Sequence, residues 1–156
     1  MRHDDLDIAG DMNYGPPEGL YHSIPHDFRA RRYGCDLYQL GSMVCFVFTS
    51  TTMNAQLSSE LNPVHHWTNW RGTFGEVLPY LQEAFARALE TIGGSIAEEI
   101  REDVIALMQQ LCEPDPAKRG DHMARAPGRN PWSLERVITR LDLLSRRAEI
   151  ARRPTR

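Results

Sequence analysis

The chain has 156 residues and a mass of 17.8 kDa, which is the size of one ordinary domain. Its composition, 41% hydrophobic and 25% charged, is close to the globular average and predicts a packed core. The formal net charge of −3 argues against a nucleic-acid-binding protein and against an acidic tail. Lys118 is the only lysine among the 18 basic residues, so any mechanism that needs a catalytic or phosphate-binding lysine has one candidate.

The cysteines and the apolar runs of the sequence indicate the cellular compartment. Cys35, Cys45 and Cys112 are odd in number and have no paired spacing, which favours free thiols in a reducing environment. The N-terminus has no apolar signal region. The longest apolar run, Met43–Phe48, is far shorter than the roughly 20 residues of a membrane span. We therefore expect a soluble, cytoplasmic protein with no membrane partner.

Taken in chain order, the first half contains one strong element. Residues 1–34 show turn signals and no sustained periodicity, which predicts a loop. From Cys35 to about Thr49, apolar residues occupy nearly every side of a helical wheel, which is typical of a fully buried helix. A strand over Met43–Phe48 is the competing interpretation, but the length of the whole stretch favours a helix. Residues 50–75 are predicted to form a polar connection.

The second half predicts three further helices and no substantial sheet, so the fold class is mainly α. The first spans about 76–92, with apolar residues at spacings of three and four, and the second opens at a capping box, Ser95-Ile-Ala-Glu98. A Pro-Asp-Pro stretch at 114–116 ends the second helix, and Asn130-Pro131 is predicted to cap a last helix that runs to about Ala151.

Three segments, in order, carry a resemblance to a known family. They are Gly-Asp-Met-Asn-Tyr-Gly-Pro-Pro-Glu at 10–18, Asp-Leu-Tyr-Gln-Leu-Gly at 36–41, and Leu-Cys-Glu-Pro-Asp-Pro-Ala-Lys-Arg at 111–119. Together they resemble the latter part of the large C-terminal lobe of a Ser/Thr protein kinase, from the end of the activation segment onward. The resemblance implies one truncated kinase-like domain over 1–156: an activation-segment-like loop (1–34), a helical core of a central buried helix and three later helices (35–151), and a basic tail (152–156).

The resemblance also implies structural roles for the motif residues Glu18, Asp36, Gly41, Asp115 and Arg119. Glu18 and Arg119 would form a buried ion pair that ties the activation segment to the late helices. The alternative is two unrelated surface charges. Asp36 is expected at the start of the central helix, where free N–H groups and the macrodipole favour a carboxylate whatever the function. In the family the matching Asp also holds the catalytic loop, which this chain lacks.

The catalytic parts of a kinase are missing from the sequence. A kinase needs a glycine-rich phosphate loop, a strand lysine, a catalytic Asp with a metal-binding Asn, and a second metal-binding Asp. Neither His-Arg-Asp-x-x-x-x-Asn nor Asp-Phe-Gly occurs, and Lys118 lies inside the 111–119 motif. Gly72-Thr-Phe-Gly-Glu-Val77 resembles the second half of a kinase glycine loop, but no Val-Ala-x-Lys follows it. We expect no catalytic residue, no cofactor and no ATP binding by this chain alone.

Other chemistry has weaker signals. The six histidines and three cysteines show no metal-ligand spacing, so no metal site is predicted. Trp67 and Trp70, in a polar segment, would pack over the helices or mark a docking surface. The arginine-rich C-terminal region, including Arg146 and Arg147, predicts either a solvated helix face or a surface for an anionic partner.

The central helix suggests how such a chain would act. In a whole kinase, neighbours cover this helix on all sides, and some of them belong to the half that is absent here. Uncovered apolar surface of several hundred Å² indicates a partner or self-association, unless the first 34 residues repack over it. The leading hypothesis is a non-catalytic kinase-like module that acts by protein–protein interaction, as a scaffold, regulator or immunity-type partner. The alternatives are the C-terminal part of a split or truncated Ser/Thr protein kinase, active only with an ATP-binding half, and a plain α-helical domain with an accidental likeness.

Overall fold

The computed structural model describes residues 11–121, 130 and 133–151. These residues form helices and no strand, so the mainly α prediction is confirmed for the described chain. The basic tail 152–156, Gly10 and the start of the 131–151 segment lie outside the described residues. The elements are η2 (Met12–Tyr14), α1 (Pro17–Leu20), α2 (Phe28–Thr49), α3 (Met53–Glu60), η3 (Pro63–His65), α4 (Phe74–Gly93), α5 (Glu98–Cys112) and α6 (Glu135–Ala151).

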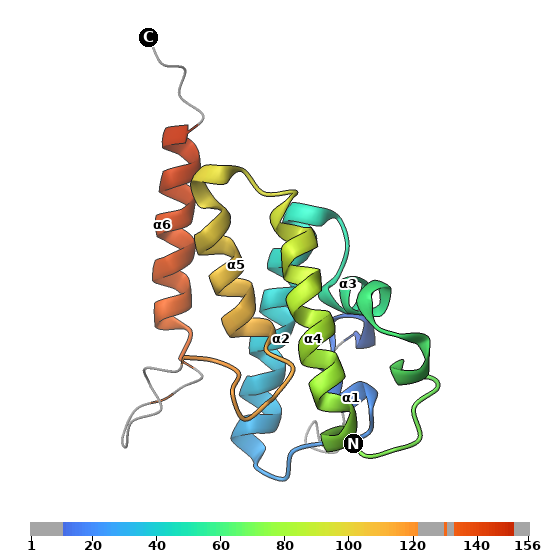
Figure 1. The fold of residues 1–156 in the computed structure, drawn as a ribbon. Helices are drawn as coiled ribbons and strands as arrows, with labels where there is room; N and C mark the ends of the chain where they lie inside the picture. The colour runs from blue at the N-terminus through green and yellow to red at the C-terminus, as the bar shows by residue number, and fades with distance from the viewer. Residues whose placement is uncertain (1–10, 122–129, 131–132, 152–156) are drawn as a thin grey trace.

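Helix α2 is the centre of the bundle. It packs against α3, α4 and α5, whereas α6 packs against α5 at one edge of the molecule (Figure 1). The long helices α2, α4, α5 and α6 run side by side, and α3 lies beside α4 on the side away from α6 (Figure 1). A helix was therefore the right interpretation of Met43–Phe48, and the competing strand was wrong.

Helix α2 begins earlier than its apolar pattern predicts. It starts at Phe28, and Asp27 caps it by accepting a hydrogen bond of 2.7 Å from the backbone N–H of Ala30. Its first turns carry three arginines and lie partly exposed, so they have no apolar periodicity to reveal them. The prediction that residues 1–34 form only a loop was therefore wrong, and so was the placement of Asp36 at the helix start. Asp36 lies more than two turns inside α2.

Residues 50–75 are not a simple connection, because they contain α3. Thr52 caps this helix by accepting a hydrogen bond from the N–H of Ala55 at 3.3 Å. Only two apolar side chains of α3, Met53 and Leu57, enter the core, and the rest of the helix is polar. Two residues are too few to give a periodic signal in the sequence.

Two predicted helix boundaries were also wrong. Ser95 does not cap α5, which begins at Glu98 after Ala97. Residues 94–96 instead form a turn at the end of α4, in which the N–H of Ser95 donates to the Ile92 carbonyl and Ile96 is buried. A capping box is present instead at Thr73 and Glu76, at the start of α4. Likewise α6 begins at Glu135, five residues beyond the predicted Asn130-Pro131 cap.

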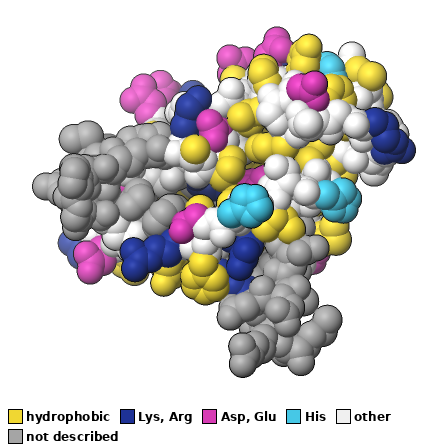
Figure 2. All heavy atoms as spheres, turned by 90° about the horizontal axis from the view of Figure 1, so that it is seen from below, with side chains coloured by type: hydrophobic (Ala, Val, Ile, Leu, Met, Phe, Trp, Pro, Cys, Tyr) yellow, Lys and Arg dark blue, Asp and Glu magenta, His cyan; other side chains and the backbone are white. Residues whose placement is uncertain are grey.

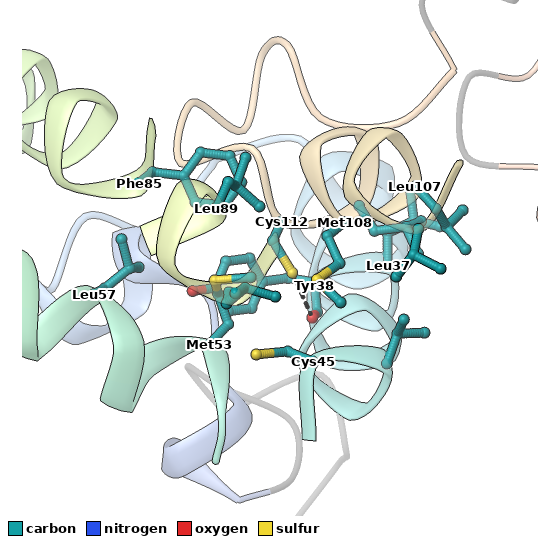
Figure 3. Packing of buried hydrophobic residues seen from close by; sticks show 14 of the residues in the cluster. Leu37, Tyr38, Cys45, Met53, Leu57, Phe85, Leu89, Leu107, Met108 and Cys112 are labelled. Atoms are coloured by element: carbon teal, nitrogen blue, oxygen red, sulfur yellow. Dashed lines mark hydrogen bonds between the residues drawn. The ribbon is translucent and has the colours of Figure 1, made fainter. Parts of the chain in front are cut away.

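Most core side chains come from α2, α3, α4 and α5 (Figure 3), and α6 adds Val137 and Leu144. The three cysteines of the chain are buried, and none forms a disulfide. The Cys112 thiol donates a hydrogen bond to the Tyr38 carbonyl at 3.6 Å, and burial raises the pKa values of Cys45 and Cys112. These two thiols therefore act as small packing groups. The labelled core residues are Leu37, Tyr38, Cys45, Met53, Leu57, Phe85, Leu89, Leu107, Met108 and Cys112.

Candidate functional site

A buried ion pair joins two segments that are far apart in the sequence. The two terminal nitrogens of Arg119 donate to the two carboxylate oxygens of Glu18, Nη1 to Oε1 at 2.7 Å and Nη2 to Oε2 at 2.8 Å. Glu18 is 3% exposed and Arg119 is 1% exposed. The pair that the resemblance implies is therefore present, with the bidentate geometry that makes arginine–carboxylate bonds strong.

Arg119 donates two further hydrogen bonds, both to backbone carbonyls. Nη1 donates to the Gly34 carbonyl at 3.1 Å, and Nε donates to the Glu113 carbonyl at 3.0 Å. The guanidinium lies 5.1 Å from the centre of the Tyr38 ring. Burial by itself would lower the pKa of Arg119, but the adjacent Glu18 carboxylate outweighs this effect and the pKa is raised. The arginine is therefore a permanent cation that joins the N-terminal segment, α2 and the end of α5.

Local sequence places both partners. Glu18 is in the first turn of α1, which Pro17 opens. Asp115 builds the turn before Arg119: its side chain accepts from the N–H of Ala117 at 2.9 Å, and its carbonyl accepts from the N–H of Arg119 at 3.1 Å. Gly120 follows with a φ of 95°, a conformation that favours glycine. Asp115 is thus a positioning residue for Arg119.

A second polar contact holds the N-terminal segment from the other side. The Tyr38 hydroxyl donates to the side-chain carbonyl of Asn54 at 2.7 Å. The Asn54 amide in turn donates to the carbonyls of Met12 at 3.2 Å and Gly15 at 2.9 Å. Both networks fix residues 12–18 against α2 and α3. The bonds of both networks thus connect segments that are far apart in the sequence.

The two other motif residues of α2 differ in their surroundings. Gly41 faces α5, where an added Cβ would meet Cys112 Sγ at 2.4 Å and Leu111 Cβ at 2.7 Å. Glycine at this position therefore permits the close crossing of α2 and α5. Asp36, by contrast, lies on the exposed side of α2.

The exposed side of α2 is apolar in its second half. Met43 is 57% exposed, Phe46 is 46% exposed and Val47 is 76% exposed. We call these three residues the α2 patch. The sequence predicted that α2 is buried on all sides, which is wrong for this face. The described N-terminal residues do not repack over it, so an apolar surface remains on the central helix of the fold.

The two tryptophans are partly buried and pack against the core. Trp67 meets the Tyr21 ring edge-on, with centroids 6.4 Å apart, and the Trp70 indole N–H donates to the Thr73 carbonyl at 3.1 Å. The packing interpretation is therefore confirmed. The same rings also line an open cleft of about 600 Å³ together with Tyr21 and Arg71.

The two arginines predicted as partner-binding both make intramolecular pairs. Arg146 pairs with Asp142 one turn earlier on α6 at 2.9 Å, and Arg147 pairs with Asp103 on α5. Both side chains remain well exposed. The cations of α6 thus serve in part to attach this helix to α5.

Sequence reasoning missed a hydrogen-bonded serine and histidine. Ser58 Oγ lies 3.1 Å from His66 Nε2, and the backbone N–H of Thr68 donates to His66 Nδ1 at 3.3 Å. His66 Nδ1 also lies 2.8 Å from Thr68 Oγ1, so both ring nitrogens have a hydroxyl partner and either one can carry the proton of the neutral ring. The Ser58–His66 bond joins α3 to the loop that follows η3.

Other site types have little support in the described residues. No group of three or more His, Cys, Asp and Glu side chains there is arranged to hold a metal ion. No helix that the structure describes is long and apolar enough to cross a membrane. On the face seen in Figure 2, the described acidic and basic side chains are interspersed with apolar ones and form no extended region of one charge.

Comparisons of the chain with protein-family models, with curated proteins and with solved structures found no match.

Proposed function

We propose that this chain is a non-catalytic module, similar to the latter part of a protein kinase C-lobe, that acts by protein–protein contact. The observation that carries the proposal is the α2 patch. An apolar surface on the central helix of a fold is costly to leave in water, and it marks a contact site more often than an isolated exposed residue does. The contact would cover the patch, either with a protein partner or by self-association.

The ion pair and the order of the three motifs support the kinase-like part of the proposal. Glu18 and Arg119 are 101 residues apart in the sequence, yet they form a bidentate buried pair. The pair was expected only because of the resemblance, since two unrelated charges at this separation have no reason to meet in the core. Asp115, which belongs to the same motif as Arg119, builds the turn that presents it.

The patch can be tested by polar substitution. We expect purified wild-type protein to bind a hydrophobic dye, to associate, or both, and we expect Met43→Gln/Phe46→Gln/Val47→Gln to reduce either signal at least about tenfold. Glutamine retains helix propensity, so far-UV circular dichroism should stay unchanged. The matched control is Leu143→Gln/Ile150→Gln, which replaces exposed apolar residues of α6 outside the patch. A wild-type protein that is monomeric, monodisperse and free of dye binding would contradict the proposal.

The absence of catalysis can be tested with nucleotide. We expect isothermal titration of the isolated chain with Mg-ATP to show no binding, because the chain lacks the glycine loop and strand lysine that hold phosphates, and Lys118 is committed to a pair with Asp115 at 3.6 Å. A thermal-shift measurement with ATP checks the same point. Saturable binding by the isolated chain would overturn the non-catalytic assignment.

One observation favours the alternative of a split or truncated kinase. Asp36 and Met43 are seven residues apart on α2, so the exposed carboxylate and the α2 patch share one stripe of the helix. A second chain that supplies an ATP-binding half and a catalytic loop would cover both. Phosphotransfer by a mixture of the chain with such a half, lost on Asp36→Asn, would favour this alternative over the non-catalytic module.

A further inference from the structure

A groove runs between α2, the start of α5 and α6. Its volume is about 570 Å³, and it adjoins the α2 patch through Val47, which belongs to both. Figure 1 shows the order of the three helices, with α5 between α6 and α2. The lining residues are Val44, Val47 and Phe48 from α2, Ala97, Glu99 and Ile100 at the start of α5, and Leu141, Leu144, Ser145 and Ala148 from α6.

The floor of the groove is apolar and its α2 wall carries no charge. Eight of the ten lining residues are apolar, and the other two are Glu99 and Ser145. No charged residue occurs anywhere between Leu37 and Ser59 in the sequence. A surface of this kind recognises apolar side chains, and its specificity must come from the opposite rim.

That opposite rim is acidic. Glu99 lines the groove directly at the start of α5. Asp142 and Glu149 lie three residues before and four residues after Ser145, so they share its stripe of α6. Arg146 balances Asp142, at 2.9 Å, but no described lysine or arginine lines the groove. The rim thus favours a ligand with positive charge beside its apolar face.

The dimensions suit a helix. The α6 residues that line the groove span Leu141 to Ala148, two turns or about 10 Å at 1.5 Å per residue. A helix laid along them would place apolar side chains at positions i, i+4 and i+7 between α2 and α6, which is the usual form of helix-in-groove recognition. Its polar flank would then face Glu99 and Glu149.

We propose that this groove binds an amphipathic helix of a partner protein. The apolar face of that helix would carry leucine or similar side chains, and lysine or arginine residues would flank this face. The inference rests on the proposed function, which it narrows to one site and one class of ligand. A second copy of the chain is a poorer match. The exposed apolar residues of α6, Ile138, Leu143 and Ile150, do not follow the i, i+4, i+7 spacing, because the position between Leu143 and Ile150 is Arg147, which pairs with Asp103.

Synthetic peptides test the proposal. The probes are labelled helices of about 18 residues, long enough to be helical alone, with leucine at i, i+4, i+7 and i+11. One probe carries lysine flanks, the second carries glutamate flanks, and the third has the lysine-flanked composition in scrambled order. By fluorescence anisotropy, we expect the lysine-flanked helix to bind at least about tenfold more tightly than either of the others.

Variants of α6 localise the binding. Ser145→Arg places a bulky cation in the groove and should weaken binding of the lysine-flanked helix at least about tenfold. Thr139→Arg, on an exposed part of α6 away from the groove, is the matched control and should change binding less than about twofold. Glu149→Lys should reduce the preference for lysine over glutamate flanks. Binding that Ser145→Arg leaves unchanged, or equal binding of the two flanked helices, would overturn the proposal.

The outcomes separate this inference from the proposed function. The α2 patch variant could lose association while Ser145→Arg retains both peptide binding and association. In that case the groove is not the binding site, but the proposed function as a protein-contact module is supported. If the wild type neither associates nor binds dye, the proposed function fails as well. Sedimentation velocity could also show a wild-type dimer that Ser145→Arg dissociates. This result would identify a second copy of the chain as the occupant of the groove and would overturn the proposal of a partner helix.

Discussion

Replacing Arg119 by methionine is expected to lower the free energy of unfolding by about 3–5 kcal/mol, because it leaves the Glu18 carboxylate buried without a counter-ion. Glu18 loses two short charge-assisted hydrogen bonds in this variant. The carbonyls of Gly34 and Glu113 also lose a donor each, which adds to the cost of the change. Urea or thermal unfolding followed by circular dichroism measures the effect.

The neighbouring residue supplies a matched control. Lys118 has a side chain that is 59% exposed, and its pair with Asp115 spans 3.6 Å. Lys118→Met removes one cation from the same turn but should change stability by less than about 1 kcal/mol, because exposed ion pairs contribute little. Equal losses for Lys118→Met and Arg119→Met would mean that the buried pair has no special role.

A double variant separates the pair from its surroundings. Glu18→Leu/Arg119→Met removes both buried charges, so it should be more stable than Arg119→Met alone. A higher free energy of unfolding in the double variant than in Arg119→Met would show that most of the destabilisation comes from the unpaired, buried Glu18 carboxylate. A double variant as unstable as the sum of the two single variants would instead show that each residue acts separately.

The parts of the fold that short motifs encode were predictable from the sequence. Helices α4 and α5 have strong periodic apolar faces, and the sequence predicted both of them. The ion pair was predictable because each partner lies in a stiff, proline-containing segment that resembles a known motif. Helix α3 was not predictable, because it contributes only Met53 and Leu57 to the core. The first turns of α2 were missed because their arginines give no apolar periodicity, although Asp27 caps the helix at this end.

The candidate contact surface was predictable only in part. Apolar residues on every side of α2 indicated that other elements must pack around the helix. They did not indicate which of its faces stays exposed. The groove depends on Val47 and Ser145, which are on helices separated by most of the chain and meet only because α5 holds α6 beside α2. No pattern within a short stretch of sequence predicts that Val47 and Ser145 line one groove. The Ser58–His66 bond was missed for the same reason, since it joins α3 to a following loop.

Gly41→Ala is expected to destabilise the fold by about 1–3 kcal/mol, although alanine is the better helix former. The new Cβ would lie 2.4 Å from Cys112 Sγ and 2.7 Å from Leu111 Cβ, so α2 and α5 must separate where both are buried. Gly75→Ala is the matched control, because an added Cβ there meets nothing within 4 Å. It should leave stability unchanged or raise it by up to about 1 kcal/mol. Chemical denaturation of both variants distinguishes the two effects, and a stabilising Gly41→Ala would show that the α2–α5 crossing is looser than the structure places it.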